Sequence, residues 1–119
     1  SMPTWNISHW TKDRVKGEKI PLEFLVRKQT KETAETFGLM DRGQIKEGYM
    51  ADINIIDHEN LCVYKPEMVH DLPTGSRRII QKAGGYIATI KSGVVTFKND
   101  EATGELPGTL IRGEQAAHA

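Results

Sequence analysis

Several residue types and patterns are scarce in this chain, and each absence excludes a class of protein. Cys62 is its one cysteine, so an intrachain disulfide and a cysteine-rich zinc site are both excluded. The 16 basic residues balance 16 acidic ones, which leaves no basic excess for binding nucleic acid. No stretch approaches about 18 consecutive apolar residues, the length that would indicate a membrane span. We expect neither a nucleic-acid partner nor a membrane partner.

Apolar and aromatic residues are also few. They make up 38% and 7% of the 119 residues. When glycine is counted and tyrosine is left out, the apolar share is about 45%, at the lower edge of globular composition, so a thin core is expected. The length fits one domain or a piece of a larger one. If it closes on itself, a chain of this size buries about two thirds of its unfolded surface. Residues 1–5 lack the basic start and apolar stretch of a signal peptide, so a cytoplasmic location is expected.

The clearest helical pattern lies in the first third of the chain. Apolar residues recur at the helical period between positions 22 and 37, which predicts a helix over Pro21–Phe37 that ends at Gly38. A break near Thr30 would divide this region into two shorter helices. Positions 1–20 are polar and predict no regular structure. We therefore divide the chain into an irregular segment 1–20, a helical region 21–38 and a β domain 39–119 with a turn-rich tail.

The remainder of the chain has the patterns of β-structure. Apolar and polar residues alternate over 51–55, which predicts a strand with one buried face. Two β-branched runs, Tyr86–Lys91 and Val94–Lys98, flank Ser92-Gly93 and predict a hairpin. Residues 58–76 are expected to form a long irregular connection, and Ile79-Ile80 to begin a third strand. Four to six short strands in an antiparallel or mixed sheet give an α+β class.

Residue patterns typical of a catalytic or metal site are not evident in the sequence. No two of the four histidines, His9, His58, His70 and His118, lie within five residues of each other, so one helix cannot present two of them to a metal. Asp52 and Asp57 flank one strand on opposite faces, which excludes a carboxylate dyad there. We predict no catalytic, cofactor-binding or metal-ligating residue. The remaining candidates are read as structural or solvated: Cys62 as a small buried side chain, Trp5 and Trp10 as packing anchors, Arg77-Arg78 as a strand start, and Gly84-Gly85 as a bend.

Segments spread along most of the chain nevertheless resemble a known family. They resemble the C-terminal portion of the N-acyl-D-amino-acid deacylases, or D-aminoacylases, of the amidohydrolase superfamily. The turn and strand over Gly38–Asp57 are shared widely in that superfamily, whereas Asp71–Gly75 and Thr103–Gly108 are typical of the deacylase branch. Further matching segments are His9–Arg14 and Ile20–Glu23.

The resemblance implies a fold and an activity for a longer parent enzyme. Such enzymes have a metal-bearing (β/α)₈ barrel and a small β-sandwich domain built from both chain ends. Pro21–Phe37 would correspond to the last barrel helix, and the strands to the C-terminal part of the β domain. Zinc is implied for the parent, where it would activate water for amide hydrolysis. The barrel ligands lie upstream of this segment, so no cofactor is expected here and the isolated chain is predicted to be inactive.

A segment without its barrel has physical consequences for association. Leu22, Leu25, Val26 and Phe37 would lose their cover, and a strand edge would stay unpaired. We therefore predict a homodimer, with exchange of helices or strands as one form of it. Two alternatives stay open. The chain could be a free-standing, non-enzymatic dimerisation or binding module derived from an amidohydrolase tail, or a small enzyme in which His9 or His70 pairs across a dimer interface.

Overall fold

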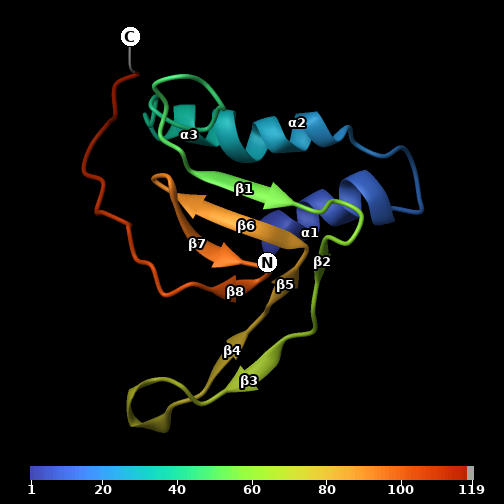
Figure 1. Ribbon diagram of the computed structural model, residues 1–119. Helices are drawn as coiled ribbons and strands as arrows, with labels where there is room; N and C mark the ends of the chain where they lie inside the picture. Colours follow the sequence, from blue (N-terminus) through green and yellow to red (C-terminus); the bar gives the residue numbers. More distant parts are fainter. Residues whose placement is uncertain (118–119) are drawn as a thin grey trace.

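The computed structural model describes residues 1–117 and has two helical segments and three small sheets (Figure 1). His118, for which a fraying tail was expected, lies outside the described residues. The helical segments are α1 (Met2–Ser8) with the π-helical turn η1 (His9–Asp13), and α2 (Leu22–Arg27), the π-helical turn η2 (Lys28–Glu32) and α3 (Thr33–Thr36) in one run. The strands are β1 (Ile53–Ile56), β2 (Cys62–Val63), β3 (Glu67–Val69), β4 (Arg78–Ile80), β5 (Ala83–Gly84), β6 (Tyr86–Lys91), β7 (Val94–Lys98) and β8 (Glu101–Ala102). The mixed α+β class is confirmed.

The helix predicted over Pro21–Phe37 is confirmed as a run of helical backbone from Leu22 to Thr36. Pro21 precedes the first turn in an extended conformation, as a residue without an N–H donor can. Around Thr30 the helix widens to the π form and does not break, since η2 joins α2 to α3 through helical backbone angles. Gly38 has φ +68° and ends the run.

The expectation that residues 1–20 are irregular is wrong. Met2–Asp13 is helical, and its inward face is formed mainly by small polar side chains. Thr4 and Ser8 are buried beside Ile7, and the hydroxyl groups of Thr4 and Tyr86 are hydrogen-bonded at 2.7 Å. Because hydroxyl groups satisfied in this way can be buried without large apolar residues, the apolar periodicity did not indicate this helix.

The predicted hairpin is confirmed at the centre of a four-stranded antiparallel sheet with the order β1-β6-β7-β8. Ser92 and Gly93 both have positive φ, +52° and +80°, as a two-residue turn of the primed type requires. The strand predicted at 51–55 is present as β1, which pairs with β6. Its expected buried face is incomplete, because Ile55 remains 46% exposed.

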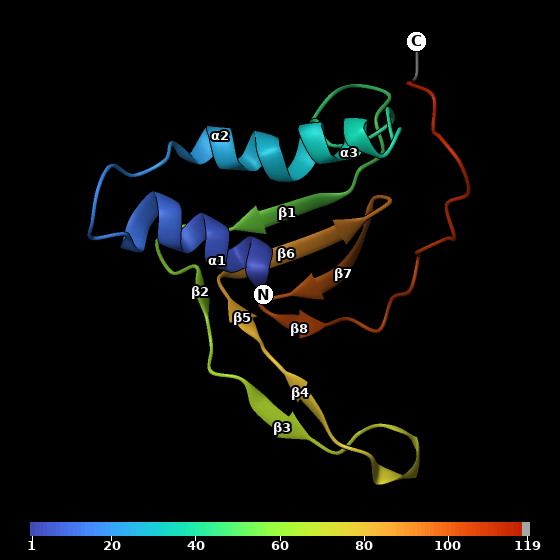
Figure 2. The ribbon, with the colours of Figure 1, turned by 180° about the vertical axis from the view of Figure 1, so that it is seen from behind.

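Residues 58–76 were expected to be irregular, and this expectation is wrong in part. β2 pairs with β5 and β3 pairs with β4, so the described residues contain eight strands instead of the expected four to six. The two pairs belong to one long interrupted hairpin that extends away from the helices, in which β2–β5 is the part next to the body of the molecule and β3–β4 is the far part (Figures 1 and 2). Each strand has only two or three residues, too few for a period-2 pattern to indicate it.

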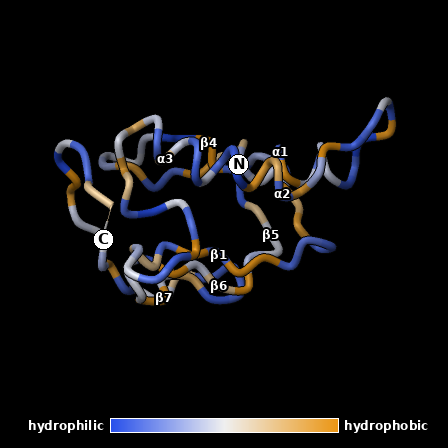
Figure 3. Tube along the Cα trace, turned by 90° about the horizontal axis from the view of Figure 1, so that it is seen from above, coloured by the Kyte–Doolittle hydropathy of each residue, from blue (hydrophilic) through white to orange (hydrophobic). Residues whose placement is uncertain are grey.

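The chain does not close on itself as its length would allow. Ile7, Ala34 and Leu61 are the buried apolar side chains of the described residues. The accessible surface is 8970 Å², whereas about 6450 Å² is typical of a compact protein of 13.3 kDa. The radius of gyration of 16.4 Å likewise exceeds the value of about 13.5 Å for a compact chain. Figure 3 shows the helices and the four-stranded sheet as separate layers.

The apolar side chains that are exposed on the second helical segment match the predicted set only in part. Val26 and Phe37 are exposed by 41% and 71%, as predicted. Leu22 and Leu25 are half-buried, because α2 packs against α1, an element that the sequence did not predict. Phe24, which was not among the four residues, is 48% exposed.

Candidate functional site

The described histidines lie in different parts of the fold. His9 is in η1, His58 follows β1, and His70 is exposed after β3. Among residues 1–117, no group of three or more histidine, cysteine, aspartate or glutamate side chains is close enough to hold a metal ion. The described residues therefore do not fit the zinc that the resemblance implies for a parent enzyme.

The outer face of α1 and η1 carries a column of rings that the sequence did not predict as a group. The rings of Trp5 and His9 are stacked with centroids 4.5 Å apart and planes 7° apart. Trp10 meets the His9 ring edge-on at 5.1 Å, and the Arg14 guanidinium lies 4.7 Å from the centroid of the Trp10 ring. Trp5, which was expected to be a packing anchor, packs against the His9 ring but remains 45% exposed. The i,i+4 spacing of Trp5 to His9 and of Trp10 to Arg14 was the available signal.

The opposite side of η1 holds the turn between β1 and β2. The Lys12 ammonium donates hydrogen bonds to the backbone carbonyls of His58, Glu59 and Leu61 at 3.2, 2.8 and 3.0 Å. The Thr11 hydroxyl lies 2.7 Å from both the Ile7 carbonyl and Nε2 of His58. Three carbonyls converging on one ammonium fix the turn to the helix, so Lys12 and His58 have structural roles in this arrangement.

Asp52 and Asp57, the two aspartates that flank β1, have separate partners. Asp52 accepts hydrogen bonds from the Lys91 ammonium and from the backbone N–H of Ser92, both at 2.9 Å, and from Arg42 at 3.3 Å. Asp57 accepts hydrogen bonds from the backbone and side-chain N–H groups of Asn60, which lower its pKa. Asp52 thus holds the turn between β6 and β7 in place, and Asp57 caps the turn that follows β1.

The pH dependence of stability tests the role of Asp52. Burial raises the pKa of this carboxyl, but the hydrogen bonds from Lys91 and Ser92 and the positive charges outweigh it, so the net shift is downward. A depressed folded-state pKa gives stability that is complete above the unfolded value of about 4 and is lost as the pH falls through the folded value. Asp52→Asn is expected to cost about 1 kcal/mol at neutral pH and progressively less in acid. Urea unfolding of both proteins from pH 7 to pH 2.5 measures this, and a difference independent of pH would contradict it.

The remaining residues singled out in the sequence form no common site. Cys62, which was expected to be buried, is a free thiol in β2 and is only half-buried. Tyr64 covers Gly84 so closely that a Cβ there would be 2.5 Å from its hydroxyl oxygen. Arg78 begins β4, as predicted, and forms two hydrogen bonds with Asp71 at 2.6 and 2.7 Å.

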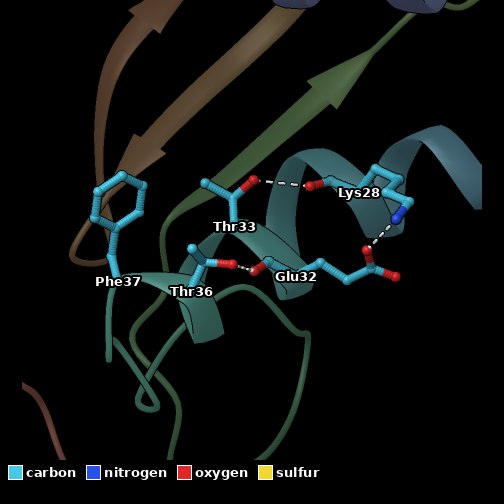
Figure 4. A pocket seen from close by; sticks show the side chains of 5 residues that line it. All are labelled: Lys28, Glu32, Thr33, Thr36 and Phe37. Atoms are coloured by element: carbon cyan, nitrogen blue, oxygen red, sulfur yellow. Dashed lines mark hydrogen bonds and ion pairs between the residues drawn. The ribbon is translucent and has the colours of Figure 1, made fainter.

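A shallow hollow of about 230 Å³ lies along the second helix (Figure 4). Phe37 lies at one end, and the ion pair between Lys28 and Glu32 lies at the other, with a separation of 2.6 Å. The hydrogen bond from Lys28 lowers the pKa of Glu32. Thr33 and Thr36, between these ends, donate their hydroxyl protons to backbone carbonyls of their own helix. The polar groups of the hollow are thus engaged within the helix and do not converge on a ligand.

Within the described residues no helix is long and apolar enough to cross a bilayer.

Comparison with known proteins identifies the family of the chain. Residues 2–97 match the sequence model of the amidohydrolase family. Over 91 residues the chain is 33% identical to a D-aminoacylase from Alcaligenes xylosoxydans xylosoxydans, a region that is 76% of this chain and 17% of that enzyme. No solved structure is significantly similar. Because the family match covers most of its length, the chain belongs to the amidohydrolase family.

Proposed function

We propose that this chain is a non-catalytic C-terminal part of a larger cytoplasmic, metal-dependent amidohydrolase that resembles the N-acyl-D-amino-acid deacylases. In the whole enzyme, the helix from Leu22 to Thr36 is the last helix of the barrel. The four-stranded sheet is one layer of the β-sandwich domain. The full-length enzyme hydrolyses an amide C–N bond, and the isolated chain is inactive.

The observation that carries this proposal is the surface left uncovered. The accessible area exceeds that of a compact protein of equal mass by about 2500 Å². Large apolar side chains contribute to it on both helical segments and on the sheet, as Trp5, Phe24, Ile55 and Phe97 show with exposed fractions of 44–48%. Large apolar side chains exposed on several elements are typical of a surface that is covered in the assembled protein, and the amidohydrolase match supports the rest of such an enzyme as the cover.

A chimeric enzyme tests the proposal. The chain's 91 matching residues replace the corresponding segment of the Alcaligenes D-aminoacylase, and hydrolysis of an N-acetyl-D-amino acid is measured. We expect the chimera to retain zinc-dependent turnover, because the segment only supports the catalytic part. The same enzyme with the segment deleted is the control and is expected to lose activity through misfolding.

The isolated chain is assayed beside the chimera with added zinc. No turnover above the uncatalysed rate is expected. Zinc-dependent turnover by the isolated chain would contradict its non-catalytic role, and a chimera that folds as well as the native enzyme but lacks activity would contradict the proposed equivalence of the two segments.

A further inference from the structure

The far part of the long hairpin, residues 67–80, forms an arm that extends away from the body of the molecule. It contains β3 and β4, which pair with each other, and a turn at Pro73–Gly75 (Figures 1 and 2). Within the described chain, the side-chain hydrogen bonds of residues 67–80 all stay inside the arm. The arm is therefore shaped by its own contacts, with the Asp71–Arg78 pair closing the end of the ribbon.

A two-stranded ribbon of this kind is marginally stable in water when nothing packs on it. Met68 and Ile79 lie directly opposite each other and are 51% and 67% exposed. In the described residues both outer edges of the arm are unpaired, because β3 pairs only with β4. An apolar cross-strand pair next to a free edge is the surface that natural proteins pair or cover.

The charges on and around β3 indicate what can pair with its free edge. The sequence from Lys65 to Asp71 has opposite charges at equal distances from Met68. If two copies of β3 pair antiparallel about Met68, each Glu67 lies opposite an uncharged Val69. If the pairing continues for two residues beyond each end of β3, each Lys65 lies opposite Asp71 of the other copy. The β4 edge lacks this property, because Arg77, Arg78 and Lys82 are all basic and would accumulate positive charge.

We propose that the arm is a homodimerisation element in which the β3 edges of two copies pair antiparallel about a two-fold axis at Met68. The product is a four-stranded sheet with the order β4-β3-β3-β4. The axis closes the assembly at two copies, so the edge is used up and does not continue into a fibre. A chain without net charge does not oppose this association. The strands lie side by side, and no element is exchanged.

Charge reversal tests the pairing through two single variants. Lys65→Glu places two acidic groups opposite each other in a homodimer, and Asp71→Lys places two basic groups opposite each other. We expect each variant alone to have a dimer dissociation constant at least about tenfold higher than that of the native chain. An equimolar mixture of the two variants regains opposite charges at both positions, so native-like association is expected. Sedimentation velocity over a concentration series measures all four samples.

Cross-linking provides a second readout that does not depend on charge. In a Cys62→Ser background, Met68→Cys brings two thiols together, since Cα atoms opposite each other in antiparallel strands are about 4.5–5.5 Å apart and within disulfide reach. Ile79→Cys is the matched control, because β4 lies away from the axis. We expect an oxidised dimer only for Met68→Cys. A native chain that stays monomeric at all concentrations, association unchanged by both charge reversals, or equal cross-linking of both cysteine variants would overturn the proposal.

Discussion

Replacing Leu61 with alanine is expected to lower the free energy of unfolding by about 2–5 kcal/mol, one of the two largest losses we predict. Leu61 is 1% exposed and is the one large side chain that is completely buried in the described part of the chain. The substitution removes three carbon atoms from a site whose backbone is fixed by Lys12 and Gly85, so the surroundings can close over the cavity only in part.

Leu110→Ala is the matched control, because the same atoms are removed from a side chain that is 76% exposed. Its effect should stay within about 0.5 kcal/mol. Urea unfolding followed by tryptophan fluorescence measures both variants, since Trp5 and Trp10 lie in the helical segment that packs beside β2. Equal losses for Leu61→Ala and Leu110→Ala would show that Leu61 is not the centre of the core.

The elements that the sequence predicted are those specified by neighbouring residues. The β6–β7 hairpin depends on a two-residue turn with the Ser92-Gly93 sequence, and the helix after Pro21 depends on a periodic run of apolar residues. Both signals lie within about 17 residues of sequence, so they can be identified without knowledge of the rest of the fold. The structure confirms both elements at nearly the expected boundaries.

The elements that were missed depend on contacts between distant residues. Thr4 and Ser8 are polar, so the sequence does not indicate that they are buried. The burial of Thr4 is explained by its hydrogen bond to Tyr86, 82 positions later. In the same way, β2 and β5 are two residues each and are held by pairing across about 20 positions. Local propensity contains no information about such partners.

In the candidate site too, the features specified by sequence spacing could be predicted, and those that depend on distant residues could not. The wide spacing of the histidines was visible in the sequence, and the structure places His9 and His58 in separate contacts. The column of Trp5, His9, Trp10 and Arg14 was missed because residues 1–20 were not assigned to a helix, without which an i,i+4 spacing has no meaning. The role of Lys12 could not be predicted, because the three carbonyls it binds belong to a turn more than 40 residues away.

Gly85→Ala is expected to cost about 3 kcal/mol or more, because it combines two penalties. Gly85 has φ +98°, a conformation that strains any residue with a Cβ, by about 1–2 kcal/mol. A Cβ at this position would also lie 2.8 Å from Cα and 3.0 Å from the backbone nitrogen of Leu61. The Gly85 backbone cannot easily move away, since its carbonyl accepts a hydrogen bond from the N–H of Asp57 at 2.8 Å.

Gly93→Ala separates the two penalties. Gly93 has a similar φ of +80°, but no atom lies within 4 Å of the Cβ that alanine would add, so only the conformational strain of about 1–2 kcal/mol is expected. The difference between the two variants in urea unfolding therefore measures the contact with Leu61. A Gly85→Ala loss equal to that of Gly93→Ala would mean that the backbone near Leu61 yields, in which case the small core is more deformable than its close contacts indicate. A clearly larger loss would show that the crossing of β5–β6 over Leu61 is the rigid part of the molecule, around which the exposed helices and the arm are arranged.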